Sequence, residues 1–257
     1  ARRWGRRMIP KIWDWLTDPA NWSGADGIAT RVQEHLTYSL IVLAIASLIA
    51  LPLGLWIGHT GRGRPLVSAA NAARAVPTLG LLFALALWLG PRLSGDLAFT
   101  APSIIVLVLL ALPPLLAGAY AGVEAVDPAT RDAARGMGLS DGQVLRQVEL
   151  PIALPLLLSG VRAATLQVIA TATIAAYVGL GGLGRFLIDG LAIGDYAATA
   201  GGALLVAVLA LLVDLLLAGV VRLLVSPGLT GKQSRRRRVE LSAAGPLIDR
   251  RRDVIPN

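Results

Sequence analysis

Five long apolar runs, separated by polar stretches, constrain the fold of this chain more than any other feature of its sequence. Each run is long enough to cross a hydrocarbon core of about 30 Å, because a helix rises about 1.5 Å per residue. The runs are Leu36 to Gly58, Leu66 to Gly90, Phe99 to Gly122, Ile152 to Val178, and Ala197 to Val225. With 55% hydrophobic residues and a mean hydropathy of +0.66, the chain is too apolar for one soluble domain. We therefore expect an all-α integral membrane protein with about five transmembrane helices.

Proline and glycine interrupt every run near an end or a bend. They are Pro52, Pro77, the Pro113-Pro114 pair, Pro155, and the Gly201-Gly202 pair. Lipid tolerates such residues only where neighbouring helices cover the freed backbone groups. The spans are therefore expected to pack against one another as a bundle, with a bend at Pro77.

A mostly polar loop, residues 123–155, joins the third and fourth runs, and its first half predicts a short helix. Asp127 can cap that helix and Pro128 suits its first position. Gly138 can take the left-handed conformation that ends it and sets a corner.

The second half of the loop predicts another short helix. Ser140 followed by Gln143 forms a capping box, and Pro151 is expected to end the helix near Leu150. The same pattern also fits a plain solvated loop or a DNA-binding helix-turn-helix. Its basic residues are Arg131, Arg135 and Arg146. The membrane character of the chain argues against DNA.

This loop resembles the EAA loop of ABC-transporter permeases, which has an acidic residue, two alanines, a glycine four residues on, and an aliphatic-x-Leu-Pro ending. The matching residues here are Asp132, Ala133, Ala134, Gly138, Val148, Leu150 and Pro151. Asp132 stands where the family more often has Glu, and Val148 replaces a common Ile. The resemblance implies that the loop sits in a cleft of a cytoplasmic ATPase, whose backbone can approach the small alanines closely, and transmits its motion.

The rest of the chain is similar to type I importer permeases of osmoprotectant systems for glycine betaine, carnitine and choline. The stretches that carry this likeness are RAVPTLGLLF (74–83), LALPPLLAGAYAGVEAVD (110–127) and ATLQVIATATIAAYVGLGGLGRFLIDG (164–190). The resemblance implies a type I ABC importer fold and a permease subunit. A methionine-like or other amino-acid importer permease is the alternative within that class. A self-contained secondary transporter or channel is the alternative from another class.

The chain lacks a convincing phosphate-binding loop, since the nearest candidate has Gln233 where Ser or Thr must reach magnesium. We therefore expect a transport subunit that binds no cofactor and hydrolyses no ATP. His35 and His59 stand alone in the sequence, so no metal site is expected. The resemblance implies four kinds of partner: an ATPase subunit that carries ATP and magnesium, a second permease copy or relative, an extracellular or periplasmic solute-binding protein, and membrane lipid. Nucleic acid is not expected.

Charge in the loops predicts the orientation in a prokaryotic plasma (inner) membrane. If residues 123–155 are cytoplasmic, alternation places Arg62 and Arg64 inside, together with the basic tail 227–257, as the positive-inside rule requires. That tail is expected to be disordered and to contact anionic lipid. The permease domain is assigned to residues 30–226.

The N-terminal segment, residues 1–29, conflicts with this orientation, because five spans place its basic residues outside. We expect residues 1–7 to be an upstream extension without structural weight, since Met8 is a natural start. The tryptophans that follow predict a short helix on the membrane surface. Thr30 and Gln33 predict a capping box at the start of the first span.

Three ionisable residues lie within the apolar runs, namely Arg74, Arg162 and Asp214. Such groups are costly in lipid and face the bundle interior. Arg162 and Asp214 lie at similar depths, so we expect Asp214 to pair with Arg162 or, failing that, with Arg74. A pair that fixes helix packing is favoured over a direct role in solute passage.

Polar residues and breakers in the second and fourth runs are candidates for a translocation path. They are Pro77, Thr78, Thr165, Gln167, Thr171 and Tyr177. Small and hydroxyl residues serve close helix packing equally well, so both interpretations stay open. The GLGGLG stretch at 179–184 follows a span rather than a strand, which favours a flexible external loop over a nucleotide site. The span aromatics, including Phe83 and Tyr177, are not expected to converge into a cation cage, which would leave solute selection to the binding protein.

Overall fold

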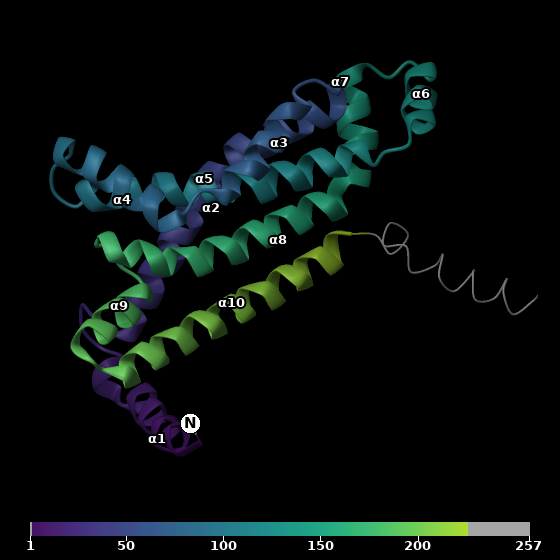
Figure 1. Cartoon of the computed structure of the whole chain (residues 1–257). Helices are drawn as coiled ribbons and strands as arrows, with labels where there is room; N and C mark the ends of the chain where they lie inside the picture. The colour runs from purple at the N-terminus through teal and green to yellow at the C-terminus, as the bar shows by residue number, and fades with distance from the viewer. Residues whose placement is uncertain (1, 226–257) are drawn as a thin grey trace, which may run out of the picture.

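The computed structural model describes residues 2–225, which are mostly helical and contain no strand. The helices are α1 (Arg2–Thr17), α2 (Ile28–Thr60), α3 (Arg64–Ala72), α4 (Thr78–Leu89), α5 (Leu97–Glu124), α6 (Pro128–Gly136), α7 (Asp141–Val144), α8 (Leu150–Ala175), α9 (Gly184–Ile193) and α10 (Tyr196–Leu224). The polar helices α6 and α7 lie at one end of the bundle, and α1 and α9 lie at the other (Figure 1). The predicted tail, residues 227–257, lies outside the described residues.

Four segments in the described part of the chain are helical, long and apolar enough to cross a membrane. They are α2, α5, the continuous helix from Asp141 to Val178 that contains α7 and α8, and α10. The remaining predicted span is broken into α3 and α4, which meet at an angle of 92° and bring the number to five if they count as one span. Pro77 lies at the break and Val76 before it is extended, because proline disfavours helical geometry in the preceding residue. The predicted bend at Pro77 is confirmed.

Helix α5 packs closely between α2 and α8, and glycines make this possible. A side chain on Gly118 of α5 would lie 2.7 Å from the Cα atom of Gly160 on α8. A side chain on Gly54 of α2 would lie 2.7 Å from the Cβ atom of Ala119. Because lipid is as apolar as the helices, close backbone packing of this kind holds transmembrane bundles together.

A proline in the middle of α5 is accommodated by a side chain from α8. Pro114 has no N–H to donate to the carbonyl of Leu110, four residues earlier. The Nε2 atom of Gln167 donates to that carbonyl oxygen at 2.8 Å. The neighbouring helix therefore satisfies the freed backbone group, as the sequence led us to expect for breakers within the spans.

The N-terminal segment begins with a helix. The backbone of residues 2–7 belongs to α1, and the expectation that residues 1–7 are an upstream extension stays a prediction. Trp13 and Trp22 are exposed, but Trp15 packs against Gly201 of α10 and the ring of Phe186 on α9. Helix α1 is thus attached to the bundle.

The predicted start of the first span is also wrong. Helix α2 begins at Ile28 with Gly27 as its cap, and the Thr30 hydroxyl donates to the carbonyl of Gly24 instead of forming a capping box. Gln33, the expected capping-box partner three residues after Thr30, does not cap the helix, because α2 has already begun two residues before Thr30.

Candidate functional site

Helix α6 forms as the sequence predicts. The Asp127 side chain accepts from the backbone N–H of Ala129 at 2.9 Å and caps the helix, with Pro128 in its first turn. Gly138 follows the helix with a φ of +89°, in the left-handed region, and no atom approaches the position of its missing side chain. The corner between α6 and α7 therefore depends on this glycine.

The second helix of the loop starts as predicted but does not end. Ser140 and Gln143 form the capping box, with the Ser140 N–H donating to Gln143 Oε1 at 2.8 Å. Beyond α7 the chain makes a π-helical turn, Leu145–Glu149, and continues through Pro151 into α8. An α-helical proline clashes with the carbonyl four residues earlier, and a π turn relieves this by lengthening the preceding turn. The predicted stop near Leu150 is therefore wrong.

The residues of the EAA-like pattern divide between two faces. Asp132 and Ala133 are exposed on α6, whereas Ala134 is only 2% exposed and packs inward. The expectation that both alanines are open to another protein is thus wrong for Ala134. Val148 and Leu150 are half-buried and Pro151 is exposed. Met137, which the sequence analysis did not single out, is 76% exposed beside the corner.

A cluster of ionisable side chains lies beneath α6. Glu149 is fully buried, and its Oε2 atom lies 2.6 Å from His59 Nδ1 while its Oε1 atom lies 2.8 Å from Arg131 Nε. Arg131 also donates through Nη2 to the carbonyl oxygen of Val123. Sequence reasoning missed this cluster and took His59 as an isolated residue at a span end. The one sequence feature that could have indicated the cluster is Glu149, a single acidic residue close to the start of the apolar run at Ile152.

The predicted intramembrane pair between Arg162 and Asp214 is present. Arg162 Nε lies 2.5 Å from Asp214 Oδ1, and Nη2 lies 2.6 Å from Oδ2, so the guanidinium meets the carboxylate through two parallel contacts. The pair joins α8 to α10. Arg74 does not take part, since it lies exposed in the turn between α3 and α4.

The candidate path residues separate into two groups. The hydroxyls of Thr165 and Thr171 donate to carbonyls of their own helix at 2.9 and 2.7 Å, and Gln167 bonds to α5, so these side chains serve packing in this structure. Thr78 lies at the start of α4, next to the bend at Pro77, and Tyr177 is half-exposed at the end of α8.

Two aromatic side chains converge although the sequence analysis expected them not to. The rings of Phe83 on α4 and Tyr177 lie edge to face, with centroids 6.5 Å apart. Together with Phe99 of α5 they line a cavity of about 600 Å³. The residues are far apart in sequence, and α4, which follows the bend at Pro77, brings Phe83 to Tyr177.

The glycine-rich stretch 179–184 is not the free loop that was expected. Leu180 and Leu183 are buried, and the backbone N–H of Gly182 donates to Glu34 Oε2 at 2.7 Å. The stretch is therefore held against the start of α2.

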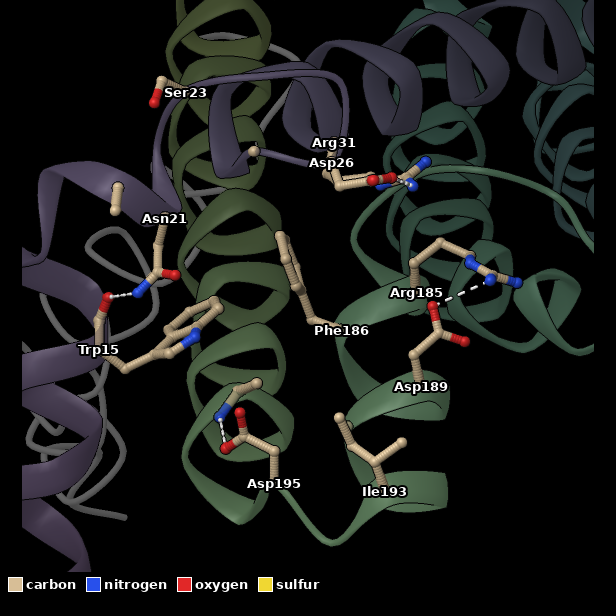
Figure 2. Close-up of a pocket in the computed structure, with 14 residues that line it drawn as sticks. Trp15, Asn21, Ser23, Asp26, Arg31, Arg185, Phe186, Asp189, Ile193 and Asp195 are labelled. Atoms are coloured by element: carbon tan, nitrogen blue, oxygen red, sulfur yellow. Dashed lines mark hydrogen bonds and ion pairs between the residues drawn. The ribbon is translucent and has the colours of Figure 1, made fainter.

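A second cavity, of about 350 Å³, is lined by residues of α1, α9 and α10 (Figure 2), and α1 and α9 lie at the end of the bundle opposite α6 (Figure 1). The rings of Trp15 and Phe186 and the Arg185–Asp189 ion pair, at 2.9 Å, line it. This end combines charged, polar and aromatic groups, as a surface that meets water does.

Comparison with known proteins adds to this geometry. Residues 36–226 match the family described as binding-protein-dependent transport system inner membrane component. The chain is similar to the choline transport system permease protein OpuBB of Bacillus subtilis, with 30% identity over 77% of this chain and 89% of that protein. It is 34% identical to the carnitine transport permease protein OpuCD of Listeria monocytogenes, over 74% and 83% of the two chains.

Among solved structures, the fold is similar to that of the MetNI methionine ABC transporter in an inward-facing conformation. The TM-score is 0.67 at 22% identity, and the likeness covers 77% of this chain and 96% of that one. Since the identity is low, this likeness speaks for the fold, which is that of type I importer permeases.

Proposed function

Because the chain belongs to the family of binding-protein-dependent transport system inner membrane components, we propose that it is the permease subunit of an ATP-driven importer for an osmoprotectant such as glycine betaine, carnitine or choline. It is a multi-pass membrane protein and a transport subunit rather than an enzyme. Relatives named for these solutes, at about a third identity over most of the chain, support the solute class.

The observation that carries the proposal is that α6 has one buried face and one exposed face. One face, with Arg131 and Ala134, is attached to the bundle, while Asp132, Ala133 and Met137 face away from it. Helix α6 lies at the end of the bundle (Figure 1), where a separate subunit can reach its outer face. Small and apolar side chains on that face suit a close-fitting cleft of an ATPase.

The ATPase binds ATP and magnesium, and this chain binds neither. Helix α6 and the C-terminus are cytoplasmic in this proposal, and a second permease copy or relative completes the pathway. Closure of two ATPase subunits around ATP moves the α6 helices, tilts the bundles and opens a central cavity outward, and hydrolysis resets it. A solute-binding protein delivers the solute at the opposite end, near α1 and α9.

Within this chain the proposed path passes the bend at Pro77 and Thr78 and the cavity beside Tyr177. The faces of aromatic rings attract quaternary ammonium ions, which the named osmoprotectants carry. Phe83, Phe99 and Tyr177 supply such rings. Thr165, Gln167 and Thr171 support the helices that frame the path, since their polar atoms are bonded within the bundle.

Transport assays with purified components test the proposal. The chain is reconstituted in liposomes with its cognate ATPase and solute-binding protein, and uptake of labelled choline, glycine betaine and methionine is measured. We expect uptake of a quaternary ammonium solute that requires ATP and both partners. Uptake of methionine alone would indicate an amino-acid importer. Uptake by the lone chain driven by an ion gradient would indicate a secondary transporter.

A further inference from the structure

We propose that the contacts of Glu149 with Arg131 and His59 transmit movement of α6 to the transmembrane helices. These three residues are called the joint below. This inference rests on the proposed function, since it assigns positioning residues to the coupling between an ATPase and the permease. The EAA-like pattern includes none of the three residues.

Both oxygens of the buried Glu149 carboxylate are engaged. One lies 2.6 Å from His59 Nδ1 and the other lies 2.8 Å from Arg131 Nε. A carboxylate can only accept hydrogen bonds, so the Nδ1 atom of His59 carries the hydrogen in this contact. The carboxylate therefore accepts a hydrogen bond from His59 through one oxygen and forms an ion pair with Arg131 through the other, and the two partners come from different helices.

The cluster joins four helices at one place. His59 belongs to the last turn of α2, Arg131 to α6, and Glu149 to the π turn that leads into α8. Arg131 adds a bond to the carbonyl of Val123, near the end of α5. Beside the buried Ala134, one carboxylate and one guanidinium thus link α6 to the three closely packed spans of the bundle.

The backbone segments that connect α6 to α5 and α7 are short turns, in contrast to the side-chain cluster of Glu149, Arg131 and His59. The residues between α5 and α6 form a turn, and the corner at Gly138 is a left-handed glycine with open space around it. The turn and the corner interrupt the helical hydrogen bonds, so the backbone on either side of α6 is a less rigid link than a continuous helix. A buried carboxylate that loses its cationic partner, in contrast, is strongly disfavoured. Movement of α6 is therefore passed to α2, α5 and α8 by the charged cluster.

The π turn explains why the carboxylate lies at this point. The extra residue in the turn changes which side chains of Leu145–Glu149 face inward, and it places Glu149 against α2 and α6. π-helical turns occur frequently at functional sites. The same turn directly precedes Pro151 at the start of α8, so the proline and Glu149 lie at one irregular point of the helix.

Substitutions that remove charge while keeping shape test the joint. Glu149→Gln and Arg131→Met are compared with the unchanged chain in the complete transporter, with the ATPase and the binding protein, in liposomes. We expect both variants to bind the ATPase and hydrolyse ATP, while the number of solute molecules imported per ATP falls by about tenfold or more, since a coupling difference of about 1.4 kcal/mol corresponds to tenfold. His59→Gln, which keeps a donor for Glu149, should lose less.

Arg162→Met is the matched control, because it breaks another ion pair of α8 without touching α6. A merely structural effect of charge removal would lower the import per ATP in this variant as well. Unchanged import per ATP in Glu149→Gln and Arg131→Met would overturn the proposal. If the unchanged chain itself binds no ATPase, the proposed function fails instead.

A distance measurement covers the case in which the variants do not fold. The chain contains no cysteine, so spin labels can be placed at Thr130→Cys on α6, with Thr60→Cys at the end of α2 or Leu223→Cys on α10. In the complete transporter we expect ATP to change the distance from α6 to α10 and to leave the distance from α6 to α2 unchanged. If ATP changes the distance from α6 to α2 by as much as the distance from α6 to α10, the proposal that the cluster makes α6 and α2 move together is wrong.

Discussion

Arg162 of α8 and Asp214 of α10 face each other so that the guanidinium and the carboxylate make two parallel contacts, of 2.5 and 2.6 Å. The most apolar 18-residue stretch of α10 contains no buried residue, so this pair is a specific attachment of α10 to the rest of the bundle. In a membrane an unpaired charge at such a position is costly.

The pair leads to the first prediction. Arg162→Met or Asp214→Asn should each lower the midpoint of thermal unfolding in detergent, because each leaves a charge without its partner. The double variant Arg162→Met with Asp214→Asn should recover part of the loss, since neither charge remains. A double variant that loses the sum of the two single losses would contradict an interaction between the residues.

Gly138 should be sensitive to any side chain. At a φ of +89° an L-residue is strained, by about 1–2 kcal/mol, and a β-branched residue is least tolerated. Gly138→Val should therefore re-aim α6 and reduce solute import per ATP while the protein still inserts. Gly142→Val is the control, because Gly142 has open space and lies outside the left-handed region. Equal import per ATP in the two variants would show that coupling does not depend on the conformation of Gly138.

The two alanines of α6 should respond differently to enlargement. Ala133→Leu should weaken co-purification of the ATPase and leave thermal stability unchanged, because its side chain projects outward. Ala134→Leu should cost about 1–3 kcal/mol of stability, because the site is closely packed. Met137→Ser should also weaken ATPase binding. Retained ATPase binding in Ala133→Leu would show that this face is not the docking surface.

The aromatic cavity should affect the solute concentration needed for uptake. A cation over an aromatic ring gains about 0.5–2 kcal/mol, so Tyr177→Ala or Phe83→Ala should raise the KM for choline or glycine betaine uptake by about 2- to 30-fold. Trp88→Ala is the control, since Trp88 is on the same helix and does not line the cavity. An unchanged KM in all three variants would show that the rings of Phe83 and Tyr177 do not contact the solute during transport.

Gln167 should matter for stability rather than for transport. Gln167→Leu leaves the carbonyl of Leu110 unpaired beside Pro114, at a cost of about 1–3 kcal/mol. We expect a lower unfolding midpoint and an unchanged KM for the solute. A raised KM with normal stability would contradict this prediction and indicate that Gln167 lines the translocation path.

Features that depend on neighbouring residues along the chain could be predicted. The apolar runs predicted the spans, the Pro77 bend is a local backbone effect, and the cap at Asp127 and the corner at Gly138 follow from residues within one or two turns. The pair of Arg162 and Asp214 was predicted because both charges were rare within apolar runs and lay at matching depths.

The remaining features depend on how helices rotate and cross. The sequence determined by itself that the chain spans the membrane and carries a two-helix loop, because hydrophobic length and capping act over a few turns. Only the tertiary structure decided that Ala134 faces inward, that Phe83 meets Tyr177, and that Glu149 joins His59, 90 positions away, to Arg131. Contacts between distant residues are set by the packing of all the helices together, through close glycine contacts and a π turn that no short sequence pattern specifies.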